Sequence, residues 1–439
     1  MDTEIEIIDN NQNNISEKRI KQSRFMYILE AAFEYFIDIL VAGAYIAKVT
    51  TSIGISDELT GILTSFVTLG SGFQIFALLF IRKKRVKSWV TFGNTINQLS
   101  FALIYIIPFF NISKNDKTLL FIIFLLLGNI LSKVFFSPKT NWFMSLVDND
   151  KRGRFTATKE IVSLLSGFIF SFIIGRVMDN YEAMGDIKQS FIFCAICIFV
   201  LSILHVLTLV FSVEKENTKV NTISLKQQLG SILKQKSIYK IIFLTMLWHV
   251  AIGFSTPFYG VYQISELGFS MTFIAILSLL YAVIRSLFEH PLGKFADKRS
   301  FVSMLNICYT VALIAFIVNI FTVPSNGKIF YTIYYSLYAI AMAGINSSEI
   351  NLVYDYVSEE NRVGALAIKN TIIGFTGFFS TLLASRLVKY IQANGNSIFG
   401  INLYAQQAIS FVTAVLIIFT IVYMNLALRK VKTNKNVEE

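Results

Sequence analysis

Charged residues are scarce in this 439-residue sequence, where Asp, Glu, Lys and Arg together make up only 15%. Hydrophobic residues make up 54% and aromatic residues 14%, and no long polar stretch is available to form a large soluble domain. Apolar runs of about 20 residues recur along the chain, as is typical of helices that cross a bilayer. The sequence therefore predicts an all-α integral membrane protein.

The sequence also lacks the common catalytic and cofactor motifs. It has no glycine-rich phosphate loop, no Ser-His-Asp set and no cluster of metal ligands, so we expect no enzyme activity, no cofactor and no metal. Its three cysteines, Cys194, Cys197 and Cys308, all fall within apolar runs. Cys194 and Cys197 have the spacing of a redox or zinc motif, but no second ligand pair accompanies them, which favours buried free thiols.

Twelve apolar runs predict twelve transmembrane helices in two sets of six. The first set lies at about residues 25–48, 59–81, 89–110, 118–137, 157–178 and 189–212, and the second at about 238–262, 271–290, 301–323, 329–347, 365–387 and 404–428. We expect two six-helix bundles at 25–212 and 238–428, flanked by polar tails at 1–24 and 429–439 and joined by a linker at 213–237.

The placement of the cations predicts how the chain crosses the membrane. The net charge is +11, and most of the 39 Lys and Arg residues fall in the termini and in the loops on the same side of the predicted membrane. Because cytoplasmic loops are enriched in these residues, we expect both termini in the cytoplasm. No basic soluble domain or aromatic platform is present, so we expect no nucleic-acid partner.

Three acids lie four residues apart in the first apolar run: Glu30, Glu34 and Asp38. This spacing puts them on one helix face, and at about 1.5 Å per residue the last two lie near the middle of the membrane. Acids at this depth usually face a water-filled cavity, pair with cations or bind protons. We expect them to bind a proton or a cationic substrate. The alternative is a structural ion pair, with Lys133 in the fourth helix as partner.

The two sets of helices are related by an internal repeat. At an offset of 210 residues, Ser137, Asn141, Arg152, Ala157, Lys159, Gly167, Phe168 and Arg176 align with Ser347, Asn351, Arg362, Ala367, Lys369, Gly377, Phe378 and Arg386. Parallel repeats of six helices indicate a transporter with a central site between its halves.

At this point the chain resembles the major facilitator superfamily, and the resemblance extends from Arg24 to Arg429. The closest local match is the loop from Gly293 to Arg299, which contains Asp297. The resemblance implies that Gly293 and Asp297 help to latch the cytoplasmic ends of the bundles against Arg152 and Arg154. More narrowly, the chain is similar to functionally unassigned permeases of low-GC Gram-positive bacteria, which implies a location in the bacterial plasma membrane.

Further candidates lie in the second half. Aligned with the first helix at an offset of 214, the seventh places Trp248 and His249 near the acid positions. We expect both in the substrate cavity, where His249 either relays a proton or is a hydrogen-bonded packing residue. Pro257, with Gly253 and Gly260 beside it, should weaken the outer half of this helix.

Helix ten carries four tyrosines on one face: Tyr331, Tyr334, Tyr335 and Tyr338. Tyr334, Tyr335 and Tyr338 are expected to contact substrate. The alternative for this face is an interfacial aromatic belt, which suits Tyr331 best. Arg285 is a further cavity candidate, while Arg285 and Lys369 can instead snorkel to the cytoplasmic surface or pair with Glu289 and Glu349.

The linker between the halves has an amphipathic pattern from Thr222 to Lys240, which favours a short helix on the cytoplasmic leaflet over a plain solvated linker.

We therefore expect a monomeric secondary transporter that works by alternating access and exports a small amphipathic or cationic organic compound in exchange for protons. Proton-coupled uptake of a small polar nutrient, such as a sugar, nucleoside or peptide, is the first alternative. A lipid flippase or a non-transporting membrane receptor is the second.

Overall fold

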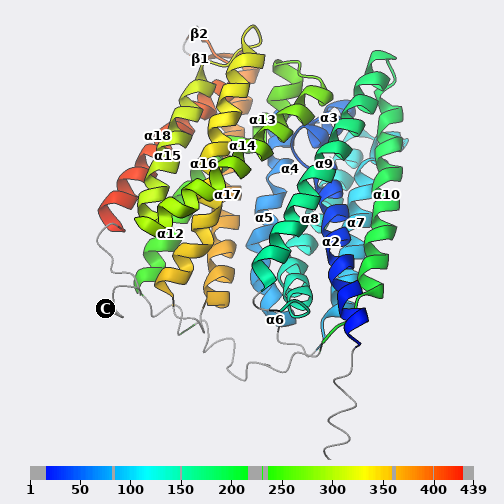
Figure 1. The fold of residues 1–439 in the computed structure, drawn as a ribbon. Coiled ribbons are helices and arrows are strands. Elements are labelled where there is room, and N and C mark those ends of the chain that lie inside the picture. Colours follow the sequence, from blue (N-terminus) through cyan, green and yellow to red (C-terminus); the bar gives the residue numbers. More distant parts are fainter. Residues whose placement is uncertain are drawn as a thin grey trace, which may run out of the picture.

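The computed structural model describes residues 16–81, 85–148, 151–215, 230, 236–357, 362–398 and 400–428. The helices of residues 17–211 lie on one side of the molecule and those of residues 236–427 on the other (Figure 1). A short hairpin marks the upper end of the molecule, which we call the hairpin end. The opposite end, where the first described helix begins, is the terminal end.

The first half consists of α2 (Glu17–Leu40), α3 (Gly43–Ile53), α4 (Asp57–Thr64), α5 (Phe66–Gly72), η1 (Gln74–Phe76), α6 (Ala77–Ile81), α7 (Lys87–Ile104), η2 (Ile107–Phe109), α8 (Lys114–Met144), α9 (Arg152–Ala183) and α10 (Ile187–Phe211). Taken together, α2 with α3, α4 to α6, and α7 with η2 form the first three predicted helices. The predicted apolar runs of this half therefore coincide with observed helical segments.

The second half consists of α12 (Lys236–Gly253), η4 (Thr256–Phe258), α13 (Tyr259–Val261), η5 (Tyr262–Glu266), α14 (Met271–Lys298), α15 (Phe301–Ile320), α16 (Gly327–Tyr356), α17 (Arg362–Ala393), β1 (Ser397–Ile398), β2 (Ile401–Asn402) and α18 (Ala405–Ala427). The segments α12 to η5 together form the seventh predicted helix. Strands β1 and β2 pair antiparallel and form the hairpin that names the hairpin end.

Nine helices within the described residues are long and apolar enough to cross a membrane. The other three predicted spans are α2 with α3, α7, and α16. Their lower hydropathy has a visible cause, because α2 carries the acidic stripe, α7 carries Asn94, Asn97 and Gln98, and α16 carries its tyrosines. These polar groups lower the mean hydropathy of the three spans, although each of them is a helix where the sequence predicts one.

Serine residues begin several of the long helices. The hydroxyls of Ser16, Ser113, Ser270 and Ser300 each accept a hydrogen bond from the backbone N–H three residues later. This contact satisfies one of the free N–H groups at a helix start. Because Ser16 caps α2, the helix begins well before the apolar run at residue 25.

The first and seventh predicted helices are both broken near the middle. The first breaks between Leu40 and Gly43, where Gly43 has a φ of 49° and the Tyr105 hydroxyl donates to the Leu40 carbonyl at 2.6 Å. The seventh breaks after Gly253 and continues through the short 3-10 turn that contains Pro257. The prediction that Pro257 weakens this helix is confirmed. At the offset of 214 residues, Gly43 aligns with Pro257, so the two breaks are related by the repeat.

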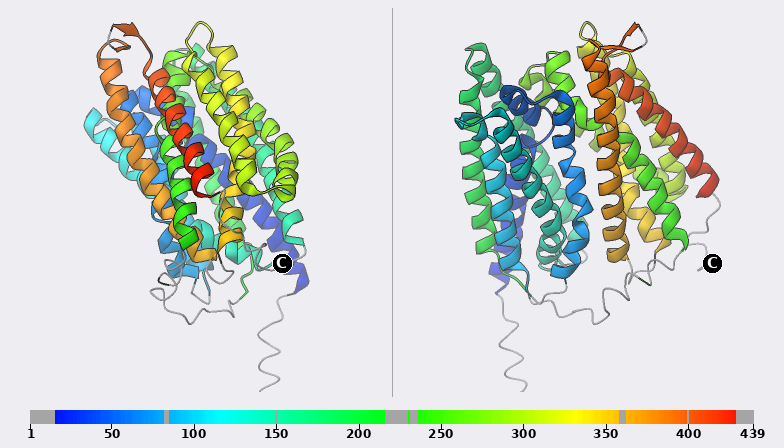
Figure 2. Two further views of the ribbon diagram at one scale, coloured as in Figure 1. Left: turned by 90° about the vertical axis from the view of Figure 1, so that its left-hand side faces the viewer. Right: turned by 180° about the vertical axis from the view of Figure 1, so that it is seen from behind.

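The two halves meet along two seams, one between α9 and α14 and the other between α4 to α5 and α17. The view from behind shows the same division into two groups (Figure 2, right). Three cross-half contacts depend on glycine in the half of the molecule toward the hairpin end. A Cβ atom on Gly260, Gly61 or Gly175 would collide with Gly43, Phe258 or Met271, respectively. The halves are therefore in van der Waals contact at the hairpin end.

Both predicted tails fall largely outside the described residues, at 1–15 and 429–439. The same is true of most of the predicted amphipathic helix from Thr222 to Lys240.

Candidate functional site

The acidic stripe on α2 divides into two parts with different surroundings. Glu30 and Glu34 both form ion pairs with Lys139 of α8, with Nζ to carboxylate oxygen distances of 2.6 Å in each case. Glu30 also contacts His205 of α10, whose Nε2 lies 2.8 Å from Glu30 Oε1. Glu30, Lys139 and His205 are buried almost completely. This part of the stripe therefore forms a structural ion-pair network.

The basic partner differs from the one considered from the sequence. Lys133 makes no ion pair with the stripe among the described residues, whereas Lys139 makes two. The reason is the antiparallel course of α2 and α8. Lys139 is level with Glu30 and Glu34, while Lys133 lies about 9 Å closer to the hairpin end, at the level of Asp38.

Asp38 is in a different environment. Its side chain is exposed, and within the part of the chain that the structure describes it makes no hydrogen bond or ion pair. The carboxylate opens into a cavity of about 520 Å³ between α2 and α9 of the first half and α14 and α16 of the second half. Of the three stripe acids, Asp38 is therefore the one that is free to bind a ligand.

The lining of this cavity, which we call the Asp38 cavity, carries more negative than positive charge. Four carboxylates line it, from Glu34, Asp38, Glu160 and Glu289, against two cations, from Lys159 and Arg285. Three tyrosines complete the polar wall: Tyr35, Tyr281 and Tyr335. Carboxylates and aromatic faces both attract cations, so the Asp38 cavity can hold a positively charged or amphipathic ligand.

The tyrosine face of α16 is divided between the protein core and this cavity. Tyr331 and Tyr334 are each 1% exposed, and both rings stack edge-to-face on Tyr259. Tyr335 lines the cavity, and the ring centroids of Tyr335 and Tyr338 lie 5.1 and 6.3 Å from that of Tyr281. In this conformation, therefore, Tyr335 and not Tyr334 has access to a ligand in the cavity.

Trp248 is also in the core. It is fully buried, with its ring centroid 5.0 Å from that of Tyr309. Its neighbour His249 is half-buried and belongs to a second group of charges.

This second group, formed by His249, Glu349 and Lys369, links α12, α16 and α17. Glu349 Oε1 lies 3.6 Å from His249 Nε2, and Glu349 Oε2 lies 3.3 Å from Lys369 Nζ. Glu349 and Lys369 line a second cavity, of about 410 Å³, together with Gln74 and Ser137 of the first half and Asn346 and Asn370 of the second. The pairing of Lys369 with Glu349, one of the alternatives considered from the sequence, is confirmed.

Three residues of these networks were missed as site residues from the sequence: Lys139, His205 and Glu349. The repeat holds a signal for two of them, because the offset of 210 residues aligns Lys139 with Glu349 and Lys159 with Lys369. The same helix position thus carries a cation in one half and an acid in the other. His205 has no comparable signal.

The group of Glu30, Glu34 and His205 has the composition of a metal site, with one ligand atom from each residue within 4.8 Å of the others. The Lys139 ammonium lies at 2.6 Å from both carboxylates. It supplies the positive charge that the acids need, so this group does not fit a resident metal.

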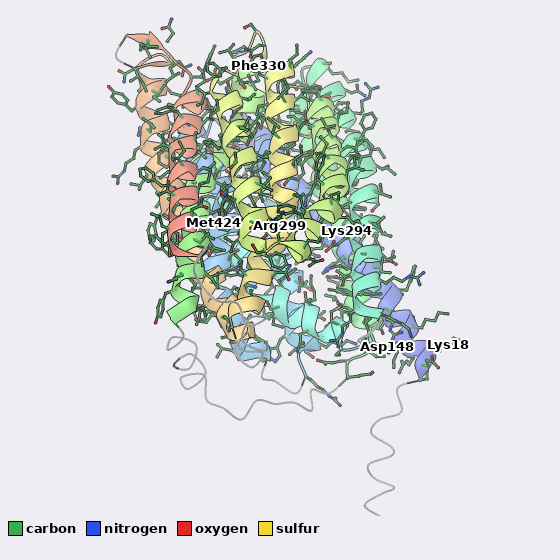
Figure 3. All side chains as sticks on the ribbon, turned by 60° about the vertical axis from the view of Figure 1, so that its left-hand side comes forward. Lys18, Asp148, Lys294, Arg299, Phe330 and Met424 are labelled. Atoms are coloured by element: carbon green, nitrogen blue, oxygen red, sulfur yellow. The ribbon has the colours of Figure 1, made fainter. Side chains whose placement is uncertain are left out.

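The predicted cytoplasmic latch is not joined by an ion pair among the described residues. Asp297 lies in the last turn of α14, whereas Arg152 donates a hydrogen bond to the Val147 carbonyl at 3.3 Å. Lys294 and Arg299, which flank Asp297, lie nearer the hairpin end than Asp148, which precedes α9 (Figure 3). Gly293 and Asp297 thus lie near the end of α14 and Arg152 and Arg154 at the start of α9, and none of these described residues pairs with another.

Asp148, which lies between α8 and α9, links this part of the chain to α2 at the terminal end. It lies 3.1 Å from the Arg24 guanidinium of α2 and 3.1 Å from Lys151. These two cations, Lys151 by hydrogen bonding and Arg24 by charge, hold the pKa of the Asp148 carboxyl below its usual value.

Polar contacts close the hairpin end on both seams. The Asp179 carboxylate of α9 accepts hydrogen bonds from the backbone N–H groups of Met271 and Thr272 at 2.8 and 2.9 Å. On the other seam, Gln392 of α17 donates to Asp57 of α4 at 2.8 Å. The halves are therefore hydrogen-bonded to each other at the hairpin end, whereas the residues of the predicted latch at the opposite end form no ion pair with one another in the described part of the chain.

The sequence matches a known protein family over most of its length. The family described as Major Facilitator Superfamily matches residues 27–381. No curated protein matches the sequence.

Solved structures show the same fold at low sequence identity. A mutant of the nucleoside transporter NupG has a TM-score of 0.71 at 12% identity, covering 93% of this chain and 100% of that one. The xylose transporter XylE from E. coli, in a partially occluded inward-open conformation, has a TM-score of 0.67 at 13% identity, covering 95% and 99%. An auto-inhibited POT family peptide transporter has a TM-score of 0.67 at 10% identity, covering 95% and 98%.

Proposed function

Because the chain belongs to the major facilitator superfamily, we propose that it exports a small amphipathic or cationic organic compound in exchange for protons. The single observation that carries this proposal is the Asp38 carboxylate, which is exposed in a cavity between the two halves and has no partner among the described residues. A charge without a partner at this depth in a membrane is costly, so a cationic ligand or a proton has a strong reason to bind there.

The aromatic residues of the cavity wall support the same ligand class. A cation held by Asp38 would be within reach of the rings of Tyr35, Tyr281 and Tyr335, which line the same cavity. A cation over an aromatic face gains about 0.5 to 2 kcal/mol, depending on how far it is desolvated. The apolar part of an amphipathic compound would pack on the same rings.

Export follows from the charge of the ligand. An inside-negative potential of 100 mV favours entry of a cation by about 2.3 kcal/mol per charge. A cation therefore enters without coupling, whereas moving it outward requires a second ion. The sequence has no nucleotide-binding motif, so a proton gradient is the expected source of energy for this outward movement.

Alternating access follows from the two ends of the molecule. If the terminal end is cytoplasmic, as the basic residues predict, the described conformation faces inward, with hydrogen bonds between the halves at the outer end and no ion pair between the described residues of the inner latch. In the opposite conformation, Asp297 would approach Arg152 and Arg154, and the contacts of Asp179 would open. A monomer is sufficient for this cycle.

One observation favours the uptake of a polar nutrient instead. Arg285 and Lys159 also line the Asp38 cavity and offer donors to hydroxyl or carboxylate groups. The structures with a similar fold include transporters of nucleosides, xylose and peptides.

The experiment that separates these functions uses the full-length protein in liposomes with a trapped pH dye. Gradients of ethidium, xylose and uridine are imposed in turn. We expect ethidium alone to drive proton movement, with protons moving opposite to the dye cation. If xylose or uridine drives proton movement and ethidium does not, the export proposal is wrong and nutrient uptake takes its place.

A further inference from the structure

The ring of His249 has one orientation that its surroundings define. Its Nδ1 atom lies 2.9 Å from the carbonyl oxygen of Thr245, one turn earlier in α12. A carbonyl oxygen only accepts, so Nδ1 must carry a hydrogen and donate it. In the neutral ring, the other nitrogen, Nε2, is then an acceptor.

Nε2 faces another acceptor. It lies 3.6 Å from Glu349 Oε1, and an ionised carboxylate has no hydrogen to offer. Two acceptors at this distance repel each other unless a proton resides on one of them. We propose that His249 and Glu349 form a proton-binding site, which holds one proton on Nε2 or on the Glu349 carboxyl and exchanges it with the adjacent cavity.

The bonding around Glu349 is suited to exchange. Its contacts to His249 and Lys369, at 3.6 and 3.3 Å, are longer than the usual 2.7–2.9 Å of charged hydrogen bonds. The contacts of Lys139 with Glu30 and Glu34 are 2.6 Å, and Glu30, Lys139 and His205 of that network are buried. Of the two charge groups, the one around Glu349 is looser and nearer to solvent.

Lys369 keeps a hydrogen-bond partner when Glu349 gains a proton. Its ammonium also donates to the backbone carbonyl of Glu349 at 3.1 Å. When the carboxylate is neutralised, this second acceptor remains, so Lys369 is not left as an unpaired buried cation. By contrast, the described partners of Lys139 are the carboxylates of Glu30 and Glu34 alone.

The proton can reach the site from the adjacent cavity, and the ionisable groups around the site can be named. Glu349 lines the cavity of about 410 Å³, whose other polar lining consists of Lys369 and uncharged groups. The ionisable groups near the pair are Lys369 of α17, Tyr309 of α15 and Tyr338 of α16. On the other elements packed against α12 and α16, α18 carries Tyr423 alone, whereas α14 carries several ionisable residues: Tyr281, Arg285, Glu289, His290, Lys294, Asp297 and Lys298. Binding of one proton changes the charge of His249, Glu349 and Lys369 together from zero to +1.

The site is separate from the Asp38 cavity, which lies on the seam of α9 and α14. Gln74 joins the halves beside Glu349, because it donates to Ser137 of α8 at 3.0 Å and accepts from Asn370 of α17 at 2.9 Å. A proton that changes the charge at this seam can therefore bias the contact between the halves. This coupling role rests on the proposed function, whereas the proton site itself does not.

The test uses the full-length protein labelled with ¹⁵N-histidine, because the chain has three histidines: His205, His249 and His290. Single His→Gln variants assign the signals, and exposed His290 serves as an internal reference. In wild type, we expect His249 to carry hydrogen on Nδ1 when neutral and to gain its second hydrogen at Nε2. In Glu349→Gln, its titration midpoint should fall by about 1 to 3 pH units.

Two further variants keep the test decisive. Lys369→Gln should move the His249 midpoint in the opposite direction, which provides an answer even if Glu349→Gln does not fold. Glu30→Gln is the matched control and should move the signal of His205 alone. The proposal is overturned if neutral His249 carries its hydrogen on Nε2, or if its midpoint is the same in wild type and both second-half variants.

A transport measurement then separates this site from the proposed function. With ethidium as the probe, Glu349→Gln should bind the cation normally but lose ethidium-driven proton movement. If the variant moves protons as wild type does, the site takes no part in coupling. If wild type moves no protons with ethidium, the proposed export fails, and the nitrogen signals still decide the proton site.

Discussion

The Lys139 ammonium lies 2.6 Å from the Glu30 carboxylate, and both side chains are buried almost completely between α2, α8 and α10. This pair separates the structural part of the acidic stripe from Asp38, which lies two turns beyond Glu30 on the same helix face. It predicts that the three acids respond differently to substitution.

Lys139→Met should destabilise the protein by about 3 to 5 kcal/mol, because it leaves the buried charge of Glu30 without its cation. The measurement is the unfolding free energy of the purified protein in detergent. The double variant Lys139→Met with Glu30→Gln removes both charges and should recover part of the loss. Equal stability of wild type and the single variant would show that the pair is not structural.

Lys139→Ala should create a metal site. The substitution removes the ammonium from a place where Glu30, Glu34 and His205 have ligand atoms within 4.8 Å of one another. Carboxylates and imidazole suit Zn²⁺. We expect Zn²⁺ to raise the melting temperature of this variant but not of wild type, and the effect to disappear when His205→Gln is added. A wild-type protein stabilised to the same extent would contradict this account of Lys139.

Asp179→Asn should weaken the contact between the halves at the hairpin end, because the Asp179 carboxylate accepts from the N–H groups of both Met271 and Thr272. Charged acceptors give bonds about twice as strong as neutral ones. Ser278 of α14 lines the Asp38 cavity. In a background without Cys194, Cys197 and Cys308, we expect Ser278→Cys to react several-fold faster in the Asp179→Asn protein than with Asp179 intact, when a membrane-impermeant maleimide is added at the hairpin end.

The matched control for this measurement is Glu182→Gln. Glu182 is also on α9, one turn from Asp179, but it pairs with Lys48 of α3 in the same half. It should leave the labelling rate unchanged. Equal acceleration by both substitutions would mean that α9 is loosened generally, and not that the contact with α14 is broken.

Much of the fold could be predicted from the sequence because it depends on local properties. The apolar runs coincide with the observed helical segments, and Pro257 marks the break in the seventh helix, since proline removes a backbone donor. The break after Leu40 had no such marker. It depends on the left-handed backbone of Gly43, which composition does not reveal.

The candidate site was less predictable because it depends on contacts between helices. The spacing of Glu30, Glu34 and Asp38 defines their common face, but which acid meets a cation depends on the level at which α8 passes α2. The same limit applies to α16, where helical periodicity groups Tyr334 with Tyr335, although one ring is buried and the other lines a cavity.

The central claim is that Asp38 is the exchangeable acid of the stripe. The most direct measurement is ethidium-driven proton movement in liposomes for wild type, Asp38→Asn and the control Glu182→Gln. The account predicts that Asp38→Asn abolishes proton movement while its melting temperature stays close to that of wild type, and that the control transports normally. Proton movement in folded Asp38→Asn at the wild-type rate would contradict it.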